Sequence, residues 1–442
     1  MKGSVRASLL ESLPAATRAA VEALAAAAAR RAFAVHMVGG PVRDHLLGRG
    51  VHDADLIVED RIPGAALELA RDALATAKIT AHGRFGTVRI ELAETRIDLA
   101  TVRSEHYPHA GALPIVAAGD LEADLRRRDF SVNALAVPLT PAAGRGRPAV
   151  VDVCGGQGDL EKKVLRILHE RSFHDDPTRA LRAARLAARL GFSLSRGSRA
   201  ALRDALRDGA FGRVSGDRLR RELEKLFEDA SRGVDAALAL RMLEEWHVLP
   251  ALEPGLRLPR TAIAPLRRLG RWLAAPPWPA AKLRRLGAAL AVWLAPLDAG
   301  LRLRTLERLS LRGELRDRIV AFPKLRDSAF RDLARARGRG AIDAALGRLG
   351  DEELLAVLAY AGPTPRRRIV RYAAEDRPRR IPVNGDDLLA LGLSGPLVGK
   401  ALARVRAGML DGVVRSREDA LVLAHELARR KPPRLRKGAP SP

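Results

Sequence analysis

The sequence predicts an N-terminal α/β domain, with a mixed sheet and flanking helices, followed by an all-α region. In the first third of the chain, short apolar segments typical of strands alternate with helical segments. From about residue 158 onward, apolar residues recur at helical spacing to the end. With 442 residues, the chain has room for two to four domains and a sizeable core.

The expected elements follow each other in this order. A helix is expected over residues 1–32, because apolar positions recur at helical spacing from Leu9 onward. Strands are then expected at 33–38, 53–59, 84–92 and 95–103, and helices at 42–47, at 63–76 and from Leu121 onward. Tyr107 to Asp120 contains two prolines and two glycines and is predicted to be a mobile loop. Further helices are expected at 158–164, 176–190, 197–208, 215–230 and 232–246, with a last helical module from about Ile381 and a disordered basic end at 431–442.

The composition indicates a partner rich in negative charge. The formal net charge is +25, and a protein this basic usually binds a polyanion, although a GC-rich genome also favours arginine and alanine. Aromatic residues make up only 4% of the chain, which argues for contacts with a nucleic-acid backbone rather than base stacking. Cys154 is the only cysteine, so an intrachain disulfide and a cysteine zinc site are excluded. We find no membrane span or secretory signal and expect a cytoplasmic protein without a membrane partner.

A glycine pair joins the first expected strand to a short helix. Gly39 and Gly40 let backbone amides approach an anion, and Arg43 offers a guanidinium fork to a phosphate. The next strand carries Asp53 and Asp55, which point to the same face because side chains alternate along a strand. Two adjacent carboxylates favour a cation between them, and Mg²⁺ takes one or two carboxylates together with substrate phosphates. A plain turn and a solvated strand edge would explain each part separately, but their spacing favours a phosphate and metal site.

A second motif spans residues 124–136 and contains three consecutive arginines. They precede a mostly apolar segment, so part of their charge is expected to face inward. Because unpaired buried charge is costly, a phosphate or carboxylate partner is implied. The alternative is a solvated arginine patch.

A third motif begins at Asp176-Pro177, which predicts the start of a helix that ends at Gly191. Asp176 and Arg179 are three residues apart and would be neighbours on one helix face. The carboxylate would accept a hydrogen bond from an exocyclic amine, and the arginine would donate to the adjacent ring nitrogen. Such a pair fits cytosine and adenine and rejects uracil and guanine without a template. A capped basic helix with no ligand is the alternative.

These motifs resemble those of the class II tRNA nucleotidyltransferase and bacterial poly(A) polymerase family, in the DNA polymerase β superfamily. The family patterns are GGxVRDxLLG followed by DxD, then RRDFTxNALA, EDxxR with RAxRF, and ERxxxEL. Differences from the patterns include Ser131 for threonine, Asp175 for glutamate, Leu186 for phenylalanine and Asp217 for glutamate. The resemblance covers residues 33–230 and 381–430, and covers the middle only in helical character.

The resemblance implies roles for individual residues. Two carboxylates would bind two Mg²⁺ ions, and a third would be a further ligand or the base: Asp53, Asp55 and Asp98. The implied nucleotide-binding residues are Gly39, Gly40, Arg43, Arg128, Asp129, Asn133, Asp176, Arg179, Arg182 and Arg185. Glu222 would pair with an arginine of the base-reading segment. Lys400 and Arg404 would contact RNA phosphates in a tail that binds the tRNA elbow.

The implied activity is template-independent addition of C and A, from CTP and ATP, to the 3′ end of tRNA, with release of pyrophosphate and no obligatory protein partner. The implied domains are a catalytic head at 1–157, a base-recognition neck at 158–230, a body at 231–375, a tRNA-binding tail at 376–430 and a basic end at 431–442. A poly(A) polymerase and a CC-only or A-only enzyme share every motif and remain alternatives. A catalytically silent tRNA-binding protein is disfavoured by the intact carboxylates. We find no HD-type phosphohydrolase signature.

Overall fold

The computed structural model describes residues 4–59, 64–82, 86–92, 95–140, 149–279 and 285–429. The chain forms two compact units, of which the first comprises Met1–Glu222 with Leu238–Gly255 and the second Leu223–Ala237 with Leu256–Pro442. The predicted disordered end at 431–442 lies outside the described residues. Among the helices of the described ranges, none has the length and apolar character that a membrane crossing requires.

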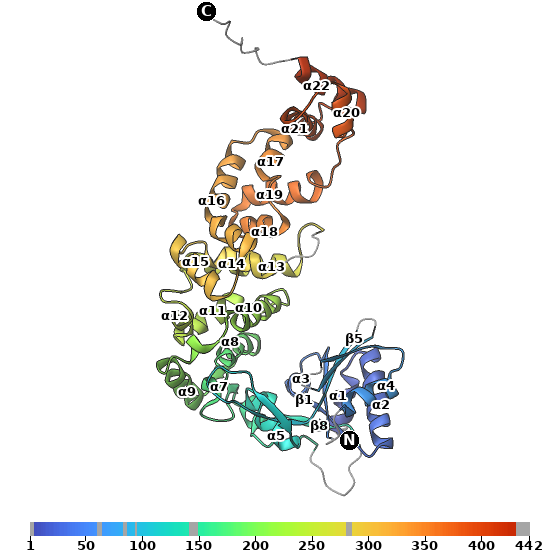
Figure 1. Ribbon diagram of the computed structural model, residues 1–442, viewed down its shortest axis with the longest axis vertical. Helices are drawn as coiled ribbons and strands as arrows, with labels where there is room; N and C mark the ends of the chain where they lie inside the picture. Colours follow the sequence, from blue (N-terminus) through green and yellow to red (C-terminus); the bar gives the residue numbers. More distant parts are fainter. Residues whose placement is uncertain are drawn as a thin grey trace, which may run out of the picture. The chain divides into compact units, whose positions relative to one another are not determined.

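A six-stranded mixed sheet lies in the first unit, with the strand order β3-β4-β5-β2-β1-β8 (Figure 1). Its strands are β1 Ala34–Val38, β2 Ala54–Glu59, β3 Lys78–His82, β4 Thr87–Leu92, β5 Thr95–Thr101 and β8 Ala136–Pro138. Strands β2 and β5 run parallel, and the other neighbours run antiparallel. The predicted mixed sheet is therefore confirmed, and so are its four predicted strands, whereas β3 and β8 were not predicted.

Helices flank this sheet. Helices α2 Ala15–Arg30 and α4 Ala65–Ala73 pack against each other and against β5, and α3 Gly40–Leu46 packs against β1 and β2. The prediction of one helix over 1–32 is wrong, because α1 Val5–Glu11 ends before Pro14 and α2 begins after it. Proline has no backbone N–H to continue the ladder of α1.

The segment between the sheet and the second motif contains a small hairpin. Strands β6 Arg103–His106 and β7 Ile115–Ala118 pair antiparallel. The prediction of a loop from Tyr107 to Asp120 is therefore wrong at residues 115–118, which form β7. Residues 107–114 connect the two strands. Helix α5 Leu121–Arg126 follows, with the Asp120 side chain accepting a hydrogen bond from the Ala123 N–H at 2.8 Å.

The rest of the first unit is helical except for a small parallel pair of strands, β9 Val164–Leu165 and β10 Ser193–Leu194. Its helices are η1 Ser131–Asn133, α6 Gly156–Glu161, α7 Ser172–Asp175, α8 Thr178–Leu190, α9 Arg196–Arg207, η2 Ala210–Arg213, α10 Gly216–Ala230, α11 Ala236–Glu245 and α12 Val248–Leu252, of which α10 and α11 extend across the division between the units.

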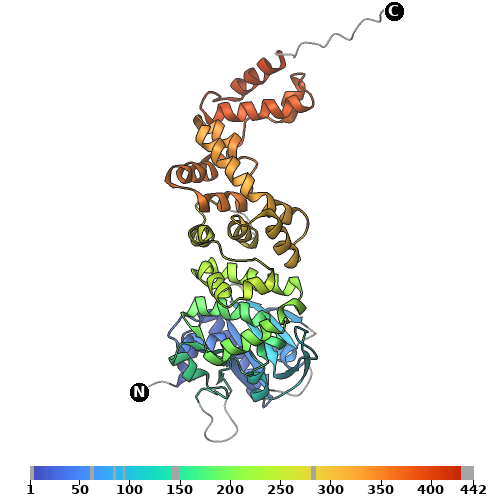
Figure 2. The ribbon, with the colours of Figure 1, turned by 90° about the vertical axis from the view of Figure 1, so that its left-hand side faces the viewer.

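The second unit is entirely helical within its described residues, which confirms the predicted all-α region. Its helices are α13 Arg260–Ala274, α14 Arg285–Leu294, α15 Ala299–Arg308, α16 Gly313–Arg335, α17 Gly338–Leu346, α18 Asp351–Tyr360, α19 Pro363–Arg371, the π-helix η3 Tyr372–Asp376, α20 Gly385–Ala390, α21 Pro396–Leu410 and α22 Arg417–Arg429. Most of these helices pack against a helix that precedes or follows them in the chain. In Figure 2 they are the yellow-to-red helices. The last three enclose their own apolar cluster, where the sequence predicted a module from about Ile381.

Candidate active site

A cavity of about 460 Å³ in the first unit brings together most of the predicted site residues. A cavity of this size is in the range that holds a nucleotide-sized ligand. The predicted residues that line it are Gly39, Gly40, Arg43, Asp55, Arg128, Asp129, Asn133, Asp176, Arg179 and Arg182. Asp53, Asp98 and Arg185 do not line it, and Lys400 and Arg404 belong to the second unit.

One end of the cavity is formed where β1 turns into α3. Gly39 has a φ of +71°, and a Cβ there would lie 2.9 Å from Nη1 of Arg128. The positive φ favours glycine at this position, and the absence of a side chain leaves room for the Arg128 guanidinium. Arg43 is buried, donates from Nε to Asp44 at 2.8 Å and from Nη1 to the Asn133 side chain at 2.5 Å. Two fixed guanidinium groups and the α3 N-terminus therefore suit a phosphate group.

Carboxylates from two parallel strands lie beside this end. Asp55 of β2 is in register with Asp98 of β5, as expected for a third carboxylate on a neighbouring strand. Burial and the nearby charge of Asp98 raise the pKa of Asp55 to about 6, and Asp53 adds to the shift. Asp98 accepts a hydrogen bond from Arg89 at 3.0 Å. Among the described residues, no group of three or more His, Cys, Asp or Glu side chains is arranged to hold a metal ion.

The donor set nevertheless fits a metal ion that is completed by a substrate. Mg²⁺ is commonly bound by one or two carboxylates together with phosphate oxygens and water. Asp55 is destabilised as an anion by the two neighbouring carboxylates, and a divalent cation would relieve this repulsion. Asp53 is mostly exposed, with Arg96 at 3.7 Å.

The raised pKa of Asp55 leads to a prediction about stability. We expect Asp55→Asn to raise the Tm of the metal-free protein at pH 7 and to leave it nearly unchanged at pH 4. A carboxyl whose folded pKa lies above its unfolded value favours folding fully below pH 3.8, and this contribution is lost as the pH rises through 6. The loss at pH 7 is at most about 3 kcal/mol. Thermal unfolding with a chelator, compared with Asp53→Asn, tests this, and an equal gain at both pH values would contradict it.

A buried carboxylate fixes two of the three arginines of the second motif. Asp124 is fully buried, and its Oδ2 accepts from Arg128 at 3.0 Å while its Oδ1 accepts from Arg127 at 2.6 Å. Arg127 also donates to Glu105 at 2.8 Å. The inward-facing charge expected of this motif therefore has carboxylate partners. Sequence reasoning missed Asp124 and Glu105, although the three- and four-residue spacing from Asp124 to the arginines could have revealed the first.

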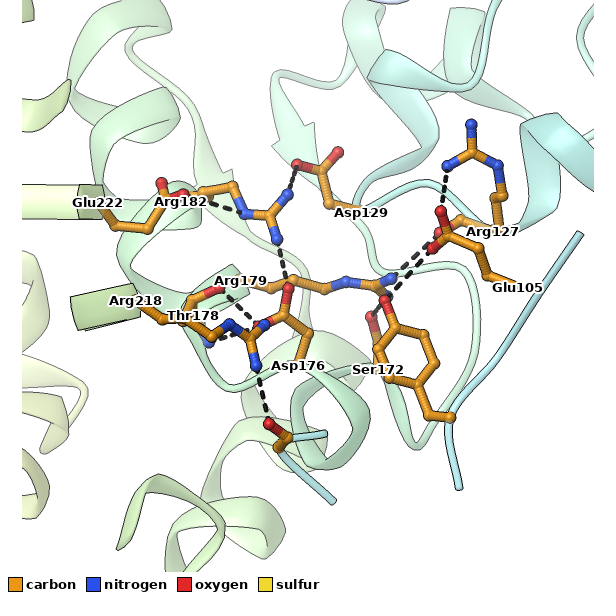
Figure 3. Close-up of polar contacts among 12 residues, drawn as sticks. Glu105, Arg127, Asp129, Ser172, Asp176, Thr178, Arg179, Arg182, Arg218 and Glu222 are labelled. Carbon is orange, nitrogen blue, oxygen red and sulfur yellow. Dashed lines mark hydrogen bonds and ion pairs between the residues drawn. The ribbon is translucent and has the colours of Figure 1, made fainter. Parts of the chain in front are cut away.

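The other end of the cavity is formed around Asp176 (Figure 3). Its Oδ1 accepts hydrogen bonds from Arg218 at 2.7 Å and from the Thr178 hydroxyl at 2.6 Å, and its Oδ2 accepts from Arg182. Burial acts to raise the pKa of Asp176, but Arg182 and Arg218 outweigh it and hold the pKa below its usual value. The group is therefore a fixed anion that faces the cavity.

The predicted pairing of Asp176 with Arg179 on one helix face is wrong. Asp176 precedes α8, which begins at Thr178, and Arg179 instead donates to the Ser172 hydroxyl and, at 3.1 Å, to the Arg127 carbonyl. Its guanidinium lies 5.9 Å from the centre of the Tyr107 ring. Both side chains nevertheless line the same cavity, each held by its own partners.

Arg182 connects the two ends of the cavity. It lies between Asp176 and Asp129, with Nη1 at 3.7 Å from Asp129, and its Nε is 4.0 Å from Glu222 (Figure 3). The pKa of Asp129 is lowered although burial opposes this, because Arg182 and the Asn133 amide stabilise the anion. The sequence analysis gave Arg218 no role of its own, although it is the arginine of the ERxxxEL motif, and it missed Tyr107, which lies far from the motifs in the chain.

Relatives identified by sequence are similar to the chain over this site. Residues 35–166 match the family model described as the poly A polymerase head domain. A CC-adding tRNA nucleotidyltransferase of Deinococcus radiodurans is 36% identical over 75% of the chain and 90% of the relative. An A-adding tRNA nucleotidyltransferase of Geobacter sulfurreducens is 31% identical over 89% of the chain, which spans 45% of that longer protein.

Solved structures extend the similarity to nearly the whole chain. A Thermotoga maritima CCA-adding enzyme complexed with tRNA has a TM-score of 0.69 and 28% identity, and the match covers 96% of the chain and 98% of that structure. Complexes of a CCA-adding enzyme with ATP and with CTP each have a TM-score of 0.70, at 28% and 27% identity, and cover 95% of the chain and 95% and 97% of those structures.

Proposed function

Because the chain belongs to the tRNA nucleotidyltransferase family, we propose that it adds C and A nucleotides, from CTP and ATP, to the 3′ end of tRNA without a template. One observation carries this proposal. At one end of a single cavity, a carboxylate lies beside a phosphate-binding turn. A fixed carboxylate and arginines lie at the other end of the same cavity. Such a cavity suits one nucleoside triphosphate, with its phosphates at the first end and its base at the second.

At the phosphate end, Arg43 and Arg128 hold the triphosphate against the backbone of Gly39 and Gly40. Asp53 and Asp55 would hold two Mg²⁺ ions, which supply activation of the RNA 3′-hydroxyl and neutralise the departing pyrophosphate. Asp98 would assist as a ligand or as the base that takes the hydroxyl proton. Asp129 and Asn133 orient the sugar end through their contacts with Arg182 and Arg43.

At the base end, Asp176 and Arg179 select the base. Oδ1 of Asp176 already accepts from the Thr178 N–H, the Thr178 hydroxyl and Arg218, so it has no acceptor position left for a base. Oδ2 keeps a free position beside Arg182 and accepts the exocyclic amine of cytosine or adenine. Nε of Arg179 is buried without a hydrogen-bond acceptor. A ring nitrogen of the base supplies a hydrogen-bond acceptor to the Arg179 guanidinium. Arg185 follows at helical spacing on α8 and supports the face of the helix that carries Arg179.

The remaining parts of the proposal concern the RNA. We assign residues 1–157 as catalytic head, 158–230 as base-recognition neck, 231–375 as body and 376–430 as a tail in which Lys400 and Arg404 contact the tRNA elbow. The net charge of +25 supports a polyanionic substrate. Because tRNA, ATP and CTP are the substrates, the proposed location is the cytoplasm, and no protein partner is required.

A split activity is the second candidate, because similar proteins bear the names A-adding and CC-adding. The test uses tRNA transcripts that end at the discriminator base, at C or at CC, each with CTP, ATP or both, and Mg²⁺. We expect two C and one A, followed by a stop. Products that stop after CC, or A added only to the CC end, would assign a split activity. A long A ladder on any RNA would mean a poly(A) polymerase.

A further inference from the structure

Helix α8, which carries the arginines of the base end, is tied to the phosphate end of the cavity by two of its side chains. One is Arg182, whose Nη1 lies 3.7 Å from Asp129. The other is Arg189, seven residues further along, which donates from Nη2 to Oδ2 of Asp44 at 2.8 Å. Seven residues make nearly two helical turns, so both arginines lie on one face of α8, about 10 Å apart along its axis. The helix is therefore held at two separate places.

Asp44 is a buried residue of α3 that lies between two guanidinium groups. Its Oδ1 accepts a hydrogen bond from Nε of Arg43 at 2.8 Å, while its Oδ2 accepts from Arg189. Burial lowers the pKa of Arg43, and Asp44 acts against this shift. One carboxylate thus joins an arginine of the phosphate end to the helix that carries the base end. Hydrogen bonds between ionised groups are short and directional, which makes this connection stiff.

Arg49 adds a contact from the segment that follows α3. It donates from Nη1 to the Arg189 carbonyl at 3.0 Å and from Nη2 to the Leu190 carbonyl at 3.4 Å. Carbonyls of the last helical turn lack partners within the helix and carry the negative end of its dipole, so a guanidinium stabilises them. The Arg49 N–H also donates to the Asp44 carbonyl at 2.8 Å, which fixes Arg49 to the end of α3.

We propose that Asp44, Arg49 and Arg189, which we call the α3–α8 bridge, set the distance between the two ends of the cavity. The inference rests on the proposed function, in which one end holds the triphosphate and the other reads the base. None of the three residues lines the cavity, so they act by positioning and not by touching the nucleotide.

The bridge matters only to a ligand that spans both ends. A whole nucleotide binds weakly if the two ends can move relative to each other, because binding must then also order them. A ligand that fills the phosphate end alone does not depend on this distance. The bridge therefore acts on ATP and CTP and not on a bare polyphosphate.

The test compares the affinity for ATP with the affinity for tripolyphosphate, which has the three phosphates of ATP without the sugar and base. Both are measured by calorimetry with Mg²⁺ and without tRNA. We expect Arg189→Gln to weaken ATP binding about tenfold and to leave tripolyphosphate binding within about twofold. The Arg189 side chain is 40% exposed, so the fold is expected to survive this change.

Two further variants make the comparison specific. Arg189 uses one N–H donor on Asp44, and Arg189→Lys can supply one, so it is expected to recover most of the ATP affinity. Arg207→Gln is the control, because it removes the same charge from an exposed arginine of the same unit that pairs with Asp204 at 3.1 Å. We expect this control to bind both ligands as the native protein does.

Equal losses of ATP and tripolyphosphate affinity in Arg189→Gln, together with a lower Tm, would mean that the contact only supports the fold. Unchanged affinities for both ligands would mean that it does not position α8. Either result overturns the proposal.

The addition assay described above separates this inference from the proposed function. Nucleotide addition by the native protein, with unchanged ATP affinity in Arg189→Gln, would leave the function standing without the bridge. A selective loss of ATP affinity in a protein that extends no RNA would leave the bridge standing without the function.

Discussion

Asp53→Ala is expected to lower the rate of nucleotide addition by a factor on the order of 10³ while leaving the affinity for tRNA within about twofold. The carboxylate is one of two that would hold the metal ions, and metal ions supply several kcal/mol of transition-state stabilisation in such reactions. Its side chain is 54% exposed, and its nearest ion-pair partner, Arg96, is 3.7 Å away. Removing it therefore leaves the packing of the sheet intact.

Single-turnover addition of A to a tRNA ending in CC, at saturating ATP and Mg²⁺, measures this loss, and filter binding measures the tRNA affinity. Asp72→Ala is the matched control, since Asp72 is a half-exposed carboxylate of the same unit that pairs with Arg31 at 3.4 Å and lies outside the cavity. A rate within tenfold of the native protein would show that Asp53 holds no essential metal ion.

The sequence predicted the parts of the fold that follow from local patterns. Strands β1, β2, β4 and β5 are apolar segments of the right length, and the pairing of the Asp98 strand beside the Asp55 strand was expected and is confirmed by their register. Strand β7 escaped prediction because its residues are mostly exposed, as Ile115 is at 59%, so no alternation of buried and exposed positions marks it. Proline at position 14 was read as part of a helix, although it separates two.

The candidate site was predictable in its membership more than in its internal contacts. Helical spacing paired Asp176 with Arg179, but Asp176 has φ −136° and ψ 90° and lies outside α8, so the spacing rule does not apply to it. Its actual partner Arg218 lies 42 residues further along the chain and is brought to it by tertiary packing. The same holds for Tyr107, whose position near Arg179 depends on the β6–β7 hairpin.

Asp176→Asn is expected to reduce the discrimination of CTP against UTP, and of ATP against GTP, by roughly 10- to 100-fold. Three donors converge on Oδ1, namely the Thr178 hydroxyl, the Thr178 N–H and Arg218. In the variant, these donors keep an oxygen at this position and turn the amide nitrogen to the place of Oδ2. An N–H donor then faces the base, where it suits the carbonyl of uracil or guanine and opposes the amine of cytosine or adenine.

The fold is expected to survive this substitution, because Asn preserves the shape of the side chain and the contacts with Thr178. Arg182 loses one anionic partner but remains 3.7 Å from Asp129 and 4.0 Å from Glu222. The ratio of kcat/KM for the right and wrong nucleotides, measured on tRNAs ending in C and in CC, tests the prediction. Asp208→Asn is the control, since Asp208 is a mostly exposed carboxylate of the same unit, paired with His174. If the variant keeps native discrimination while its rates with CTP and ATP fall alike, Asp176 positions Arg182 and Arg218 and does not read the base.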